Sequence, residues 1–358
     1  MLGFFTKNSE EYKKNAVSLA KVEAIYFPSI TLLTIMIGGL YYIKGSHHIG
    51  LNTIVEFVMY INMLTFPVSA IGLTASMIQR AAASQKRINE FLETTPEIQN
   101  PGNAVKPILQ GNIHFEKANF IYPHTAIHAL KDFDLEIKKG EKVAIVGRTG
   151  SGKSTIAQLL LRMYDATGGI INIDGKDIRQ LDLKTLREQI SYVPQDVFLF
   201  SETVENNIRF GLQKAEKPAV EKAAFQASVD REIAGFPEQY DTMIGERGVT
   251  LSGGQKQRIS IARALIKNPN LVIFDDCLSA VDARTEKEII GNLNVYLQDK
   301  TAIIITHRIF SLFAFDKIVV LEDGTIVEQG THRDLLARNG YYAGLYARQQ
   351  EQERSSEL

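Results

Sequence analysis

A glycine-rich segment near the middle of the chain carries the clearest chemical signal in the sequence. It comprises Gly147, Arg148, Thr149, Gly150, Ser151, Gly152, Lys153, Ser154 and Thr155. The apolar run 142–146 precedes it and the largely apolar run 156–161 follows it, so the pattern G-x-x-x-x-G-K-[S/T] lies between a predicted buried strand and a predicted helix. Glycines let the backbone turn tightly and aim several N–H groups at one anion, and the N-terminus of the next helix adds partial positive charge. The segment is therefore predicted to bind a nucleoside triphosphate, with Lys153 reaching the β- and γ-phosphates and the Ser154 hydroxyl ligating Mg²⁺.

Composition limits the classes of protein to consider. The chain has 358 residues, of which 45% are hydrophobic, and its formal net charge is −1. The length suggests two or three units with buried cores, and the balanced charge without a Lys/Arg-rich run argues against a nucleic-acid partner. The single cysteine, Cys277, excludes an intrachain disulfide and a Cys-based zinc site. We interpret it as a small buried hydrophobe in a reduced compartment.

Two runs without a charged residue dominate the first quarter of the chain. They cover residues 24–43 and 57–79. At roughly 1.5 Å per residue, a helix of either length spans a hydrocarbon layer about 30 Å thick. Because only a short polar link, residues 44–50, joins the runs, they predict a membrane helical hairpin in contact with lipid. A pair of buried helices in a soluble domain is the alternative interpretation.

Basic residues predict the orientation of this hairpin. They lie before the first run and after the second, whereas Lys44 alone lies in the link between them. The flanking residues are Lys7, Lys13, Lys14, Lys21, Arg80, Lys86 and Arg87. The positive-inside rule then places both termini in the cytosol. We expect a multi-pass protein of the cell membrane, either inner or plasma membrane, with its remaining domains cytoplasmic.

Beyond residue 79 the pattern predicts first an amphipathic extension of the second helix and then a linker. The extension runs to about residue 92, and the turn-forming residues from Pro96 to Asn103 end it. Three segments follow from this division. Residues 1–104 form a partial transmembrane domain, residues 105–350 form a nucleotide-binding domain, and residues 351–358 form a polar tail.

Four further stretches carry residues suited to phosphate chemistry. Gln195 follows an apolar run, Asp275 and Asp276 end the run 271–274, and His307 ends the run 303–306. A fourth stretch comprises Leu251, Ser252, Gly253, Gly254 and Gln255. In order and spacing these stretches, with the phosphate loop, resemble the nucleotide-binding domain of ATP-binding-cassette (ABC) transporters, and the 251–255 stretch resembles the family signature. The resemblance covers essentially the whole chain.

This resemblance implies a fold. It is an α/β P-loop NTPase cassette with a RecA-like core, an antiparallel β subdomain and an α-helical subdomain, preceded here by an all-α membrane hairpin. The strand-like alternation in residues 113–120 and 129–137 is consistent with the antiparallel subdomain. ATP and Mg²⁺ are the implied cofactors.

The resemblance also implies roles for individual residues. Tyr122 matches the aromatic residue that stacks on adenine, Asp275 matches the residue that holds Mg²⁺, and Gln195 matches the one that contacts Mg²⁺ and the attacking water. His307 matches the switch histidine beside the γ-phosphate. The stretch 245–248 is similar to a loop of the exporter branch that senses the coupling helices of the membrane domain.

In the family, two cassettes close head to tail around two ATP molecules, and the signature of one contacts the γ-phosphate bound by the other. A second cassette subunit is therefore an implied partner, and Asp282 is similar to the loop residue that links the two sites. The implied activity is ATP hydrolysis coupled to transmembrane transport.

The residue after Asp275 departs from the commonest pattern of the family. A glutamate usually stands there as general base, whereas this chain has Asp276. Aspartate is one methylene shorter, and misplacing a catalytic group by about 1 Å can cost roughly 100-fold in rate. In the family this replacement marks one subunit of heterodimeric exporters, so we expect a heterodimeric half. A homodimer that hydrolyses slowly through Asp276 is the alternative.

The number of membrane helices is a second departure. Exporter halves have six, whereas this chain shows two uncharged runs, which are similar to the last two. The resemblance is thus to an exporter-type half transporter of the multidrug or lipid kind that lacks its first four membrane helices. A longer gene product is one source that we expect for the missing helices. We expect a subunit that exports hydrophobic, drug-like or lipid compounds. A cassette ATPase without a transport function is the second hypothesis.

Overall fold

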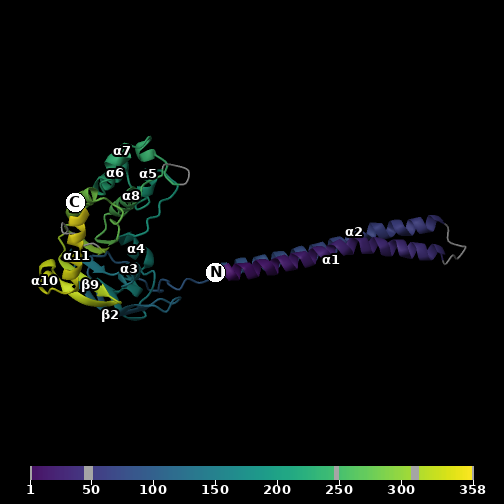
Figure 1. Ribbon diagram of the computed structural model, residues 1–358, viewed down its shortest axis with the longest axis horizontal. Helices are drawn as coiled ribbons and strands as arrows, with labels where there is room; N and C mark the ends of the chain where they lie inside the picture. Colours follow the sequence, from purple (N-terminus) through teal and green to yellow (C-terminus); the bar gives the residue numbers. More distant parts are fainter. Residues whose placement is uncertain (1, 44–50, 246–249, 308–313, 357–358) are drawn as a thin grey trace. The chain divides into compact units, whose positions relative to one another are not determined.

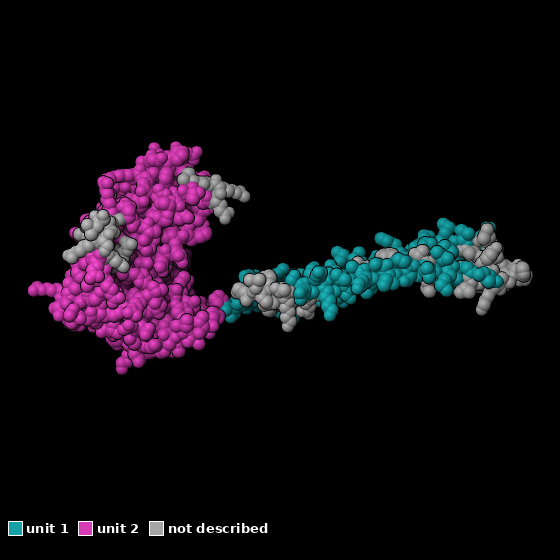
Figure 2. All heavy atoms as spheres, viewed as in Figure 1, with its two compact units in different colours: residues 1–95 teal, residues 96–358 magenta. Residues whose placement is uncertain are grey.

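The computed structural model of the chain describes residues 2–43, 51–245, 250–307 and 314–356 (Figure 1). It separates into two compact units, residues 1–95 and residues 96–358 (Figure 2). The predicted boundary near residue 105 differs from this division. Residues 96–104 belong with the second unit because hydrogen bonds attach Gln99 and Asn100 to it.

The first unit consists of two long helices that lie side by side (Figure 1). They are α1 (Leu2–Ile43) and α2 (Leu51–Leu92), each of 42 residues. Both uncharged runs lie inside these helices, and the helices continue well beyond them into charged sequence. Pro28 and Pro67 are accommodated within α1 and α2 respectively.

The surface of α2 is apolar and exposed. Among the described residues, the segment Val55–Leu92 is long and apolar enough to cross a membrane, and none of its most apolar stretch is buried. Phe66 and Ile71 are 79% and 71% exposed. The hydroxyls of Thr65 and Thr74 donate to the carbonyls one turn earlier, at 2.9 and 2.8 Å, which satisfies them without water. A lipid environment suits such a surface better than water does.

The second unit is built on a six-stranded sheet in the order β10-β9-β3-β8-β7-β6. All neighbouring strands run parallel except β10 and β9. Their bounds are β3 (Lys142–Gly147), β6 (Ile190–Val193), β7 (Leu271–Asp275), β8 (Thr301–Thr306), β9 (Lys317–Glu322) and β10 (Thr325–Gly330). In β3, Val143 and Ile145 enter one hydrophobic cluster and Ala144 and Val146 enter another. The strand is therefore buried on both faces, as its unbroken apolar sequence predicts.

A four-stranded antiparallel sheet in the order β2-β1-β4-β5 forms a second layer. Its strands are β1 (Ile113–Ile121), β2 (His128–Ile137), β4 (Gly168–Ile173) and β5 (Lys176–Asp177). Residues of β1 and β2 alternate between buried and more exposed positions over most of their length. This pattern places Phe115 and Phe133 edge to face at 5.1 Å in the core shared with the parallel sheet.

Helices cover the parallel sheet and complete the α/β fold predicted from the sequence. They are α3 (Lys153–Leu160), α4 (Leu183–Gln189), α5 (Val204–Arg209), α6 (Lys217–Gln226), α7 (Asp230–Ala234), α8 (Gly253–Leu265), α9 (Ala283–Tyr296), α10 (His332–Ala337) and α11 (Tyr341–Ser356), with short 3₁₀ turns at Ile178–Gln180 and Gln239–Asp241. Helices α5 to α9 share one hydrophobic cluster with β6, β7 and β8. The predicted α-helical subdomain corresponds to α5–α8 (Figure 1).

The linker that opens the second unit is fastened to two of its elements. The Asn100 side chain donates to Asp182 at 2.8 Å and accepts from the N–H of Leu183 at 2.8 Å, at the N-terminus of α4. The buried guanidinium of Arg162, just after α3, donates to the carbonyl of Gln99 at 3.2 Å. The bond from Arg162 brings the linker close to the end of α3, the helix that follows the phosphate loop.

The Asn100→Ala substitution tests this attachment. It removes two hydrogen bonds, one of them to the buried carboxylate of Asp182, so we expect the second unit to lose about 1–2 kcal/mol of unfolding free energy. Urea denaturation of the detergent-solubilised chain measures the loss. Asn103→Ala, an exposed position in the same linker, is the control, and equal effects of the two substitutions would contradict the assignment.

Candidate nucleotide site

The parallel sheet brings the predicted site residues to one edge. In register, Val146 of β3 pairs with Thr306 of β8, and Ile305 of β8 pairs with Asp275 of β7. The carboxyl ends of these strands are therefore level. The phosphate loop follows β3, Asp276 follows β7 and His307 follows β8, at the edge where α/β sheets bind ligands.

The phosphate loop turns between β3 and α3 through positions that require glycine. Gly150 and Gly152 have φ angles of 83° and 100°, in the left-handed region. A Cβ on Gly152 would also lie 2.2 Å from the carbonyl oxygen of Ala129 in β2. The loop is thus pressed against the antiparallel sheet, and only glycine fits at this contact.

Lys153 occupies the centre of the loop. Its ammonium donates to the carbonyls of Gly147 and Arg148 at 2.9 and 2.8 Å, and the residue is only 6% exposed. Burial lowers the pKa of Lys153 to about 8, while the nearby carboxylates of Asp275 and Asp276 act in the opposite direction. A phosphate group beside this lysine would favour its charged form.

Ser154, Asp275 and Tyr192 form a hydrogen-bonded group next to that lysine. The Ser154 hydroxyl donates to one oxygen of Asp275 at 3.0 Å, and the Tyr192 hydroxyl donates to the other at 3.2 Å. Burial raises the pKa of Asp275, and the carboxylate of Asp276 adds to this, whereas the two hydrogen bonds and the charge of Lys153 oppose it. No role was predicted for Tyr192, although its position in the strand before Gln195 is a usable signal.

Asp276 lies beside this group in a constrained backbone conformation. Its φ angle is 47°, and its N–H donates to the carbonyl of Ile305 at 2.8 Å. Gln195 donates to its carboxylate at 3.4 Å, so two of the predicted catalytic residues meet. His307 is exposed directly after the end of β8. Gln195 is also exposed.

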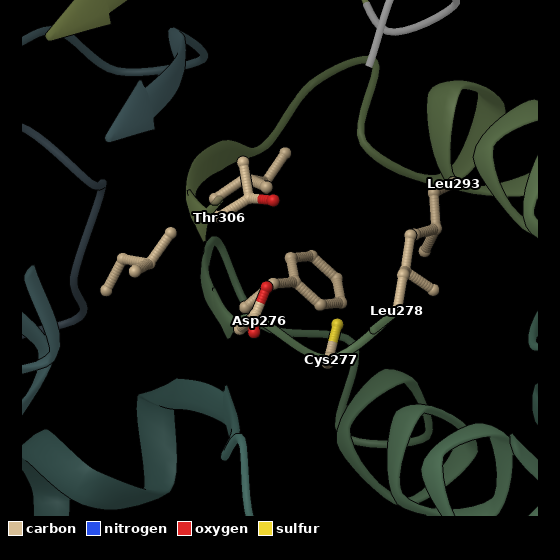
Figure 3. Close-up of a pocket in the computed structure, with 8 residues that line it drawn as sticks. Asp276, Cys277, Leu278, Leu293 and Thr306 are labelled. Atoms are coloured by element: carbon tan, nitrogen blue, oxygen red, sulfur yellow. The ribbon is translucent and has the colours of Figure 1, made fainter. Parts of the chain in front are cut away.

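A small apolar cavity lies behind Asp276 (Figure 3). Its volume is about 20 Å³, enough for one water, but its exposed lining is apolar. Figure 3 shows the sulfur of Cys277 pointing into the space between Asp276 and Leu293. Cys277 is 4% exposed, and burial raises the pKa of its thiol, so it packs as a hydrophobe.

The predicted signature begins α8 and is held in place by its own cap. The Ser252 hydroxyl accepts from the N–H of Gln255 at 3.2 Å, and the Gln255 side chain accepts from the N–H of Ser252 at 2.9 Å, which is a capping box. Leu251 is buried. A Cβ on Gly254 would lie 3.0 Å from the carbonyl oxygen of Ala280, so the signature packs closely against the segment before α9.

A residue that the sequence analysis overlooked joins these two segments. Gln257 of α8 donates to the Ser279 hydroxyl at 3.2 Å and accepts from the N–H of Ala280 at 3.1 Å. Two residues after Ala280, Asp282 caps α9 by accepting from the N–H of Thr285 at 3.0 Å, and this bond lowers the pKa of Asp282. Hydrogen bonds from Gln257 therefore hold α8, which begins at the signature, against the segment that leads to Asp282.

Tyr122 lies near the phosphate loop, at the end of the β1 sequence. Its hydroxyl donates to the Gln158 side chain at 2.8 Å and lies 3.0 Å from the hydroxyl of Thr155. Its ring packs edge to face against Phe120 and Tyr164. Stacking on adenine remains a proposal for this residue. Residues 246–248 of the predicted exporter loop lie outside the described residues.

Comparison with known proteins now decides the family. Residues 130–279 match the ABC transporter family model. A probable multidrug resistance ABC transporter ATP-binding/permease protein of Bacillus subtilis is 41% identical over 97% of this chain and 60% of its own length. The cassette is an ABC transporter domain.

Other relatives of this ABC domain and its preceding helices point the same way. An ATP-dependent lipid A-core flippase of Pseudomonas fluorescens is 38% identical over 96% of the chain and 58% of its own length. A mitochondrial iron–sulfur clusters transporter of Gibberella zeae is 36% identical over 97% and 51%. A solved bacterial Atm1-family ABC exporter with ATP bound is 36% identical, with a TM-score of 0.75 over 89% of this chain and 56% of that one.

These matches show the general biochemical activity of the ABC domain. It binds ATP and belongs to a family of transport-coupled ATPases, whose members work as pairs of cassettes. The chain spans between 51% and 60% of the length of the curated relatives just described.

The Lys153→Met substitution tests the ATP site. It removes the buried ammonium of the loop, so we expect the Kd for ATP to rise roughly 10- to 100-fold. The fold should persist, because burial of the charged ammonium is unfavourable and the uncharged methionine side chain does not carry this cost. Fluorescent ATP titration and circular dichroism measure both effects. Lys142→Met, at the opposite end of β3, is the control, and unchanged binding by the Lys153 variant would contradict the site.

Proposed function

We propose that the chain is a subunit of an ATP-driven exporter of hydrophobic, drug-like or lipid compounds. The observation that carries this is the joining of an ABC cassette to two 42-residue helices, of which α2 exposes a long apolar surface. Relatives over 96–97% of the chain are named for multidrug resistance, lipid A-core flipping and iron–sulfur cluster transport. Cassette closure on ATP would rearrange the membrane helices.

The donor set beside the phosphate loop fits Mg²⁺. Ser154 and Asp275 offer oxygen atoms 3.0 Å apart, and Gln195 lies beside Asp276 at the same edge. Among the described residues, no three His, Cys, Asp or Glu side chains gather into a ready-made metal site. This suits Mg²⁺, which uses few protein ligands and completes its shell with water and substrate phosphates. In this proposal Ser154, Asp275 and Gln195 hold the ion, which would neutralise charge on the phosphates.

Hydrolysis requires a second cassette. The N-terminus of α8, a 13-residue helix, and the Ser252 hydroxyl can both donate to a phosphate, because that hydroxyl accepts from Gln255 and keeps its own proton. In the proposal they act on the ATP held by the partner cassette. Gln195, Asp276 and His307 act on the ATP held by this chain, and Asp282 links the two sites.

Asp276 makes this chain the weaker half of a heterodimer. The left-handed backbone conformation of Asp276 fixes the position of its Cβ. The side chain therefore cannot place its carboxylate where the longer side chain of a glutamate would. The intact signature can still complete a competent site on a partner's ATP. A homodimer that hydrolyses slowly through Asp276 is the alternative.

The ATPase rate of the purified chain alone tests this assignment. We expect slow turnover of the unmodified chain and an increase of roughly 10- to 100-fold for Asp276→Glu, since about 1 Å of displacement costs on that order. Phosphate release in detergent micelles measures both rates.

Asp275→Asn in each background provides the control, because it should remove any activity that depends on the proposed magnesium ligand. Turnover of the unmodified chain as fast as that of the Asp276→Glu variant would overturn the weakened-site assignment.

The two helices of the first unit are proposed to form a multi-pass membrane hairpin with both termini in the cytosol. The exposed apolar surface of α2 supports this, as do the basic residues at the outer ends of the uncharged runs.

Alkaline carbonate extraction of cell membranes tests the hairpin. We expect the chain to stay in the pellet, because lifting a helix of about 20 apolar residues out of lipid is strongly unfavourable. The matched variant carries Phe66→Asp together with Leu73→Asp, because charged side chains oppose insertion into lipid and alanine does not. We expect more of this variant than of the unmodified chain to be released from the membrane pellet. Full solubility of the unmodified chain would instead favour a cassette ATPase without a transport function.

A further inference from the structure

The N-terminus of α11 meets the phosphate loop through one pair of side chains. The guanidinium carbon of Arg148, the second residue of the loop, lies over the ring of Tyr341 at 5.8 Å from the ring centroid. This is within the range in which a cation is attracted to an aromatic face. Nearly 200 residues of sequence separate the two partners, so the contact exists only in the folded chain.

Tyr341 is itself firmly held. The Glu328 carboxylate of β10 accepts from the backbone N–H groups of Tyr341 and Tyr342, at 2.6 and 3.1 Å, and so caps α11. Tyr342 is fully buried against Val146, the last apolar residue of β3 before the loop, and its hydroxyl lies 2.7 Å from Nδ1 of His332. The Tyr341 ring is therefore a fixed support rather than a mobile surface side chain.

The ring of Tyr341, and not its hydroxyl, makes the contact. The hydroxyl oxygen is buried and finds no hydrogen-bond partner among the described residues. A buried hydroxyl without a partner costs about 1–3 kcal/mol, so it does not explain why a tyrosine stands here. The aromatic face is the part of the side chain with a partner.

Arg148 connects this support to the phosphate-binding lysine. Its carbonyl oxygen accepts from the Lys153 ammonium at 2.8 Å and from the N–H of Ser151 at 3.2 Å. A fixed Arg148 side chain therefore restricts the movement of the Arg148 backbone, whose carbonyl accepts these two hydrogen bonds within the loop. Since Gly150 and Gly152 make the loop backbone permissive, an external support reduces the conformational entropy lost when the loop orders around phosphate.

We propose that Tyr341 is a positioning residue for the phosphate loop, acting through Arg148 to pre-order it for ATP. The proposal rests on ATP binding at this loop and extends it to the C-terminal helix. Tyr341 touches neither ATP nor Mg²⁺. Its effect falls on the affinity for ATP, and any aromatic ring at this position preserves it.

ATP titration of the full detergent-solubilised chain tests the proposal. Tyr341→Leu keeps an apolar side chain but removes the ring face, so we expect the Kd for ATP to rise roughly two- to fivefold. Tyr341→Phe restores the unmodified Kd, which a role for the hydroxyl would not allow. Tyr346→Leu, which removes another aromatic ring from the same helix, leaves the Kd unchanged.

A double-mutant cycle separates positioning from general stability. In an Arg148→Gln background the Tyr341→Leu substitution should have no further effect on the Kd, because the cation is already gone. A full two- to fivefold effect in that background, or an equal effect of Tyr341→Phe, overturns the proposal. Failure of the unmodified chain to bind ATP would instead contradict the nucleotide site itself.

Discussion

The parallel pairing of β3, β8 and β7 is the constraint on which the nucleotide site depends. Parallel strands end at the same edge of a sheet, and the register sets Val146, Thr306 and Asp275 nearly level. Ser154 and Asp275, which are 121 residues apart, can form a hydrogen bond only because of this register. The loops after the strands carry the chemistry, while the buried apolar strands fix where each loop begins.

Burial gives this edge an unusual electrostatic balance. It lowers the pKa of Lys153 and raises that of Asp275, so both groups are pushed towards their neutral forms. A polyanion beside Lys153 would raise the pKa of that lysine, and a divalent cation beside Asp275 would lower the pKa of that aspartate. Both effects are strong here because opposite charges attract more strongly where water is scarce.

Local pattern explains which parts of this structure could be predicted. The phosphate loop, the strand before it and the signature are short segments whose glycines and apolar runs carry their own structural reason, and the structure has them where the sequence places them. The contacts of Tyr192, Gln257 and Tyr341 could not be predicted, because each depends on how distant segments pack. The start of α1 at Leu2 shows the same limit, since a charged helix leaves no apolar run to mark it.

The fastening of the linker to Arg162 gives α3 a mechanical meaning. This helix has eight residues, about 12 Å of rigid rod, with Lys153 at one end and the linker-bound Arg162 just beyond the other. The linker and the phosphate loop are therefore attached at opposite ends of one short helix, and a straight helix holds its two ends at a fixed separation better than the loops around it do.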